Sequence, residues 1–85
     1  MALPQPERRM DLIEIAWRVR SPRGGTTTTC ALYRVPGRGV EVRSYHGDED
    51  GLLGSHRVVD IRTARQLAEE WHEGMIAKGF IDAGE

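Results

Sequence analysis

The chain has 85 residues, of which 39% are hydrophobic and 29% are charged, and its net charge is −1. This length allows one small domain with a thin core, and these fractions are typical of a globular protein rather than a disordered one. The slightly acidic balance argues against the strongly basic composition of many nucleic-acid-binding domains. A local basic surface remains compatible with it, because eight of the arginines lie before residue 44.

The single cysteine, Cys30, allows no intramolecular disulfide. A small secreted domain would need several, so we expect a reducing compartment, the cytoplasm. Residues 1–9 lack the apolar segment of a signal peptide, and no run is long and apolar enough to cross a membrane. We expect a disordered lead-in over residues 1–9, one domain over 10–81 and a frayed end over 82–85. Eleven of the twelve basic residues are arginine, a bias that a high-GC bacterial genome produces.

Residues 11–20 form the first predicted strand, because their side chains alternate with a period of two. One face would be wholly apolar and should point to the core: Ile13, Ile15, Trp17 and Val19. Arg18 and Arg20 would then project from the opposite face.

Two more strands are predicted over residues 26–35 and 39–46, joined by Pro36 and Gly37, the favoured central pair of a type II turn. In the strand over 26–35, two sets of side chains alternate: Cys30 and Leu32 form one, and Ala31, Tyr33 and Val35 form the other. The sequence does not decide which set faces the core. In the second, one face carries Val40, Val42 and Ser44, and the other carries Glu41, Arg43 and Tyr45.

A weaker fourth strand over residues 53–59 precedes the clearest element, a helix. Thr63 and Gln66 match the capping-box pattern of a helix start. Apolar residues follow at spacings of three and four, and Gly79 is placed to end the helix in a Schellman motif. The order predicts an α+β fold, in which an antiparallel three- to four-stranded β-meander is followed by one C-terminal α-helix packed on one sheet face.

The uncovered sheet face is the most informative surface of this fold. It is expected to carry a set of basic and aromatic side chains: Arg18, Arg20, Arg34, Arg43 and Tyr45. Arg34 belongs to this set only if Cys30 and Leu32 share its outward direction. Arginine suits phosphates and guanine edges, which favours nucleic-acid binding. The alternative is a set of cross-strand ion pairs with Glu14 and Glu41 on the same face.

Candidate catalytic and metal-binding groups are few. His46 and the aspartates Asp48 and Asp50 of the acidic loop that follows it are the candidate ligands of a metal site. The pattern is instead typical of a solvated turn, because a calcium loop needs more ligands at fixed spacing. An enzyme would need two of Cys30, His46, His56 and His72 to meet in a cleft. The four threonines at 26–29 are typical of a solvent-tolerant strand edge rather than a binding strip. We therefore expect no catalytic residue, cofactor, metal or small-molecule substrate.

These observations favour a non-catalytic interaction module, either a homodimer or an accessory subunit that binds another protein. The thin core, the uncovered sheet face and the leucines Leu12, Leu52 and Leu53, which lack an obvious place in the core, support self-association. The alternative is a nucleic-acid-binding domain that uses the arginine-bearing face. No membrane partner is expected.

Overall fold

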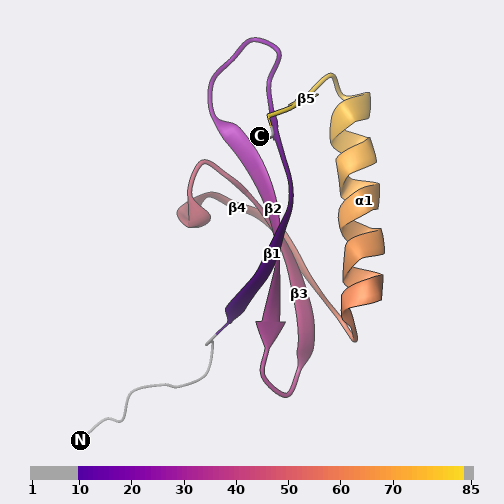
Figure 1. Ribbon diagram of the computed structural model, residues 1–85. Helices are drawn as coiled ribbons and strands as arrows, with labels where there is room; N and C mark the ends of the chain where they lie inside the picture. The colour runs from indigo at the N-terminus through magenta and orange to yellow at the C-terminus, as the bar shows by residue number, and fades with distance from the viewer. Residues whose placement is uncertain (1–9, 84–85) are drawn as a thin grey trace, which may run out of the picture.

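The computed structural model describes residues 10–83 (Figure 1). The elements, in chain order, are β1 (Asp11–Arg20), β2 (Thr27–Val35), β3 (Gly39–His46), the 3₁₀ turn η1 (Glu49–Gly51), β4 (Leu52–Val58), α1 (Ile61–Ala77) and β5 (Ile81–Asp82). The strands form one antiparallel sheet in the order β4-β3-β2-β1-β5, with α1 along one face. The predicted α+β meander followed by a helix is confirmed. The expected lead-in over residues 1–9 lies outside the described residues.

The turn between β2 and β3 follows the predicted chemistry. The amide of Arg38 donates to the carbonyl of Val35 at 2.8 Å, and Gly37 has a φ of 74°. A type II turn needs this positive φ at its third position, where glycine carries no steric penalty. The turn therefore fixes the register in which β2 and β3 pair.

The core lies between the sheet and α1. Cys30 and Leu32 of β2 and Val42 of β3 are fully buried there, together with Ala64 and Ala68 of α1. The open question in β2 is thus settled, since Cys30 and Leu32 point to the helix. Two alanines on the helix let its backbone approach the sheet closely, which suits a core this thin.

Strict alternation fails in β1. Leu12 lies opposite Tyr33 and Glu14 opposite Leu32, so Ile13 is an extra residue, and Ala16 is a second one between Ile15 and Trp17. Each β-bulge of this kind reverses the side on which the following residues fall. The prediction that Ile15 shares a face with Trp17 is therefore wrong. Both extra residues pack against the core.

Helix α1 begins two residues before the predicted capping box. Asp60 is its N-cap, and its carboxylate accepts a hydrogen bond from the amide of Thr63 at 2.8 Å. The hydrogen bonds from Thr63 and the positive charge of Arg62 favour the ionised form, so the pKa of Asp60 is lowered. The other end is as predicted, since Phe80 donates to Met75 at 3.1 Å beyond a left-handed Gly79, in the Schellman pattern.

The chain after the helix returns to the sheet. Ile81 and Asp82 pair with Arg20 and Val19 of β1, and the amide of Ala83 donates to the carbonyl of Arg18 at 2.9 Å. The expectation that the chain frays from residue 82 is wrong for Asp82 and Ala83; residues 84–85 lie outside the described range. No helix within residues 10–83 has the length and apolar character needed to cross a membrane.

Candidate interaction surface

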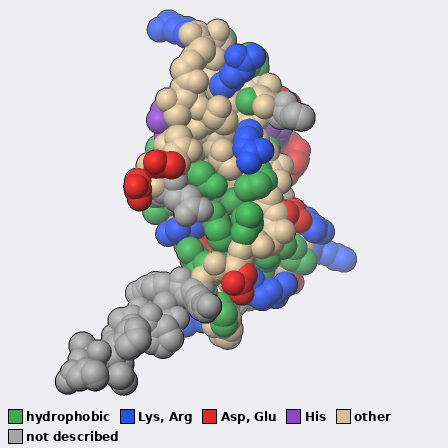
Figure 2. Space-filling model, turned by 60° about the vertical axis from the view of Figure 1, so that its left-hand side comes forward, with side chains coloured by type: hydrophobic (Ala, Val, Ile, Leu, Met, Phe, Trp, Pro, Cys, Tyr) green, Lys and Arg blue, Asp and Glu red, His purple; other side chains and the backbone are tan. Residues whose placement is uncertain are grey.

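The sheet face turned away from α1 is called the outer face below. Its residues are cross-strand partners with the same direction: Leu12, Ile15, Arg18 and Arg20 of β1, Thr27, Thr29, Ala31 and Tyr33 of β2, Glu41, Arg43 and Tyr45 of β3, and Leu52, Ser55 and Arg57 of β4. Among residues 10–83, no helix or strand packs over it (Figure 1). Hydrophobic side chains occupy the middle of this view, and charged groups of both signs surround them (Figure 2).

Exposed leucines occur at opposite margins of the outer face. Leu12 of β1 is 55% exposed, and Leu52 of β4 is 44% exposed. Ile15 and Tyr45 are half-buried, whereas Ala31 at the middle of β2 is buried. A sheet face that met only water would place polar side chains at such positions. The outer face therefore exposes apolar side chains at two margins and buries them at its middle.

Arg18 and Arg20 lie on the outer face, as predicted. Both are exposed, and no ion pair or side-chain hydrogen bond engages either of them within residues 10–83. They lie opposite Thr29 and Thr27 of β2. Their guanidinium groups are therefore available to an approaching partner.

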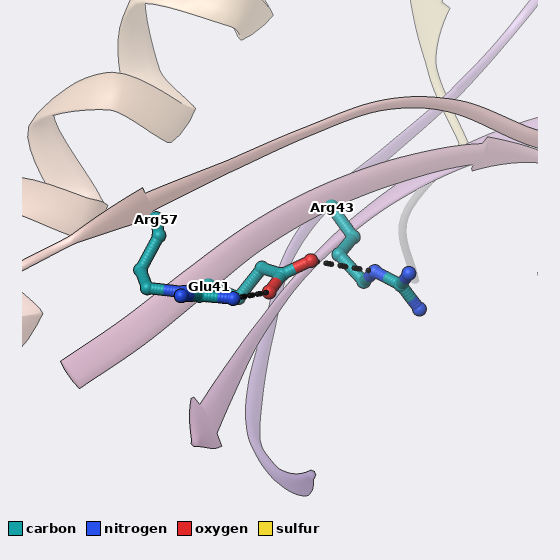
Figure 3. Close-up of polar contacts among 3 residues, drawn as sticks. All are labelled: Glu41, Arg43 and Arg57. Carbon is teal, nitrogen blue, oxygen red and sulfur yellow. Dashed lines mark hydrogen bonds and ion pairs between the residues drawn. The ribbon is translucent and has the colours of Figure 1, made fainter. Parts of the chain in front are cut away.

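Arg43 is on the same face but is already paired. Its Nε donates to Glu41 at 3.1 Å, and Arg57 of β4 approaches the other carboxylate oxygen of Glu41 at 3.7 Å (Figure 3). The Glu41 side chain is only 12% exposed, so water screens this ion pair less than one at the open surface. Glu41 thus pairs with arginines as predicted, but Arg43 is a partner on the same strand, and the cross-strand partner is Arg57, which was not in the predicted set.

Two predicted members of the outer face lie on the helix side of the sheet. Arg34 pairs with Val40 and has the direction of Leu32, because the chain alternates along β2. Glu14 is carried to that side by the bulge at Ile13. The sequence-based set of five therefore becomes four on the outer face: Arg18, Arg20, Arg43 and Tyr45.

Glu14 instead links the sheet to the helix. Its two carboxylate oxygens accept from Arg65 of α1 at 2.8 and 3.1 Å. The hydrogen bonds and the positive charge of Arg65 lower the pKa of Glu14. The predicted pairing of Glu14 with outer-face arginines is wrong. Its carboxylate instead binds Arg65 and so holds the N-terminal half of α1 against β1.

The opposite side of β4 borders a groove. Leu53 is 60% exposed and lines this groove with Trp17, Trp71 and Met75, which lie between the sheet and the second half of α1. Adjacent residues of a strand point to opposite sides, and Leu53 is the extra residue between Leu52, opposite Tyr45, and Gly54, opposite Ser44. Leu52 belongs to the outer face and Leu53 to the groove.

The candidate chemical groups are dispersed. Cys30 lies in the core, where burial raises its pKa to about 12. His46 contacts the hydroxyl of Thr28 at 3.3 Å, and Asp48 accepts from the amide of Asp50 at 3.0 Å, which closes η1. Within the described chain, no three His, Cys, Asp or Glu side chains are grouped to hold a metal ion.

The threonines at 26–29 do not form a strand edge. Strand β2 lies inside the sheet, and Thr28 and Thr29 are buried on opposite sides of it. Buried hydroxyl groups are tolerated where they form hydrogen bonds, as that of Thr28 does with the ring of His46. The prediction of a solvent-tolerant edge is therefore wrong for these two residues.

One cluster was not foreseen from the sequence. Nε2 of His72 lies 2.7 Å from the carboxylate of Asp82, and the ring of His72 lies 5.5 Å from that of Trp17. Trp17 also donates its indole N–H to the carbonyl of Ala68 at 2.7 Å. These contacts join β1, α1 and β5, and only the presence of β5, a two-residue strand without a sequence pattern, brings Asp82 to His72.

No protein-family model, curated protein or solved structure matches this chain.

Proposed function

We propose that the protein is a non-catalytic interaction module that binds a protein, as a homodimer or as an accessory subunit, through its outer face. The observation that carries this proposal is the pair of exposed leucines, Leu12 and Leu52, on a sheet face over which no described element packs. A lone exposed leucine is ordinary, but here both belong to one face with half-buried Ile15 and Tyr45.

The charged groups support a protein partner in the same way. Aromatic residues and arginine are enriched in protein interfaces, where the arginine stem covers apolar surface and its fork donates hydrogen bonds. Arg18 and Arg20 are placed to do this on the same face as Tyr45, which lies two strands from Arg18 in the same row. The cytoplasm suits such a module, because its buried thiol needs no oxidising compartment.

Nucleic-acid binding is the second candidate, and the unpaired Arg18 and Arg20 favour it. Three observations weigh against it. Arg43 is engaged by Glu41, Arg34 lies on the other side of the sheet, and Asp48 and Asp50 border the outer face at the arginine end. Phosphates near those carboxylates would be repelled, and a few contacts give little affinity at physiological salt.

Site-specific photocrosslinking in the native host tests the proposal. A photoreactive amino acid replaces Leu12 on the outer face or, as the control, the exposed Arg62 on α1. We expect a discrete protein adduct from position 12, identified by mass spectrometry, that a second substitution, Leu52→Asp, removes. Position 62 should give none, because it lies on the other side of the molecule.

The remaining outcomes decide between the two functions. A nuclease-sensitive adduct at position 12 would replace the proposal with nucleic-acid binding. An NMR titration with a short DNA duplex at low salt checks that result, since shifts at Arg18, Arg20 and Tyr45 that added salt reverses are the expected signature. The absence of any adduct at position 12 would overturn both the protein and the nucleic-acid assignment of this face.

A further inference from the structure

We propose that the outer face binds a second copy of this chain, face to face, about a two-fold axis parallel to the strands. In this arrangement the end of β1 that carries Arg18 and Arg20 faces the partner's η1 end, and Arg20 comes toward the turn that holds the partner's Asp48 and Asp50. The inference rests on the proposed function and names the partner. It is carried by the way in which opposite charges are distributed across the face.

The unpaired positive and negative groups lie at the same end of the sheet but at different margins. Arg18 and Arg20 are near the end of β1. Asp48 and Asp50 follow β3, whose last residues lie opposite Thr29 and Thr28 of the intervening strand. Figure 2 shows acidic side chains at the left margin and basic ones at the upper end of this view, with further groups of both signs along the right margin and at the lower end.

This layout is complementary to itself under one kind of rotation. A two-fold axis parallel to the strands exchanges the margins of the face and keeps its ends. The β1 margin of one copy then lies over the β3–β4 margin of the other. Arg18 lies over the partner's Leu52, which ends the same row, and Arg20 comes toward the partner's Asp50 in the turn beyond it. The contact between the arginines of one copy and the acidic turn of the other therefore forms twice, once on each side of the axis.

The other in-plane axis, perpendicular to the strands, exchanges the ends instead. Arg18 and Arg20 would then lie over the partner's Leu12, and the acidic loop over the partner's Arg57, which already contacts Glu41. Two cations would lose water without gaining a counter-charge. The charges therefore select the axis parallel to the strands, which also gives the aligned sheet packing that is common in β-sandwiches.

The available area sets the strength of the contact. Four strands at about 4.8 Å spacing and about eight residues of length give a footprint near 500 Å² per copy, or about 1,000 Å² for the pair. This is close to the lower limit of specific interfaces. We therefore expect a weak dimer that dissociates on dilution and on addition of salt.

Charge reversal with mixing tests the arrangement, with sedimentation equilibrium of the full chain as the measurement. One variant carries Arg18→Glu and Arg20→Glu, and the other carries Asp50→Arg. Asp48 is left in place because its carboxylate caps η1 by accepting a hydrogen bond from the amide of Asp50. Each variant alone should dissociate with a constant raised about tenfold or more, because like charges now face each other. An equimolar mixture should recover association as a heterodimer, because each altered charge meets its opposite.

The control variant is Arg62→Glu, which changes one exposed arginine to an acid on the far side and should leave the dimer unchanged. Circular dichroism checks that each variant is folded. A wild-type chain that stays monomeric up to about 1 mM, where even weak association is occupied, would overturn the dimer. So would a dimer whose dissociation constant neither charge reversal alters. A hetero-protein adduct from position 12 together with a monomeric chain would overturn this inference and leave the proposed function standing.

Discussion

The two faces of the sheet are built from the same strands and have different roles. Toward α1, β2 and β3 contribute Leu32 and Val42, which are fully buried against a helix of the same chain. Toward the other side, β3 contributes Arg43 and Tyr45, which remain half-buried, and β1 contributes the exposed Leu12. The contrast teaches that the helix-side face carries the stability of the fold. The outer face exposes Leu12 and Leu52 at its margins, and the proposed function gives these side chains a partner.

Leucine-to-alanine substitution on each face gives the largest expected difference. Leu32→Ala removes a fully buried side chain and leaves a cavity, so we expect a loss of about 2–5 kcal/mol in the free energy of unfolding. Leu12→Ala, which removes the same atoms from an exposed position, should change it by less than about 0.5 kcal/mol. Urea denaturation followed by circular dichroism measures both.

Equal losses from the two leucine variants would break the comparison, because the outer face would then be part of the stabilising core. These measurements belong at low protein concentration, where a weak dimer is dissociated. At high concentration association adds to the apparent stability of every variant that still dimerises.

Trp17→Phe tests how firmly the helix is held on its face. The indole N–H of Trp17 donates to the carbonyl of Ala68, and this bond joins β1 to α1 across the core. Phenylalanine keeps an aromatic ring but has no donor, so we expect a loss of about 0.5–1.5 kcal/mol. The matched control is Trp71→Phe, since the described chain shows no hydrogen bond from the indole of Trp71. If both variants lose the same amount, packing rather than the hydrogen bond accounts for the effect.

The sequence predicts the elements of this fold well. Glycine and proline mark the turns, as at Pro36 and Gly37, and the alternation of β3 has one apolar set that faces the helix. The Schellman end of α1 also follows from Gly79 alone. These features are local, and local chemistry determines them.

The content of the two faces is less predictable. Residues 12–17 contain apolar side chains at both parities, so no alternation pattern reveals the bulges at Ile13 and Ala16. Those bulges decide that Glu14 meets Arg65 rather than an outer-face arginine. The position of Arg34 depends on which side of β2 meets the helix, and that is decided by packing.

The smallest expected effect comes from the ion pair that Glu14 forms on the helix side. Because Arg65 lowers the pKa of Glu14 below its ordinary value of 4.5, folding favours the ionised carboxylate. This contribution is present above about pH 4.5 and is lost as the pH falls through the lowered value of the folded state. Glu14→Gln should reduce the stability slightly at pH 7 and flatten its decline below pH 4.5.

Arg65→Gln should flatten the same acid-induced decline, because it removes the hydrogen bonds and the positive charge that lower the pKa of Glu14 in the folded state. The double variant should add nothing further, since the two groups act only through each other. Urea denaturation at pH values from 3 to 7 measures the three curves. A decline that stays as steep as in the wild type would place the acid sensitivity elsewhere, with Asp60, whose pKa is also lowered, as the remaining group at the start of the helix. In either case the titrating carboxylates contact α1, Glu14 through Arg65 and Asp60 through the amide of Thr63, so acid should loosen the packing of the helix on the sheet.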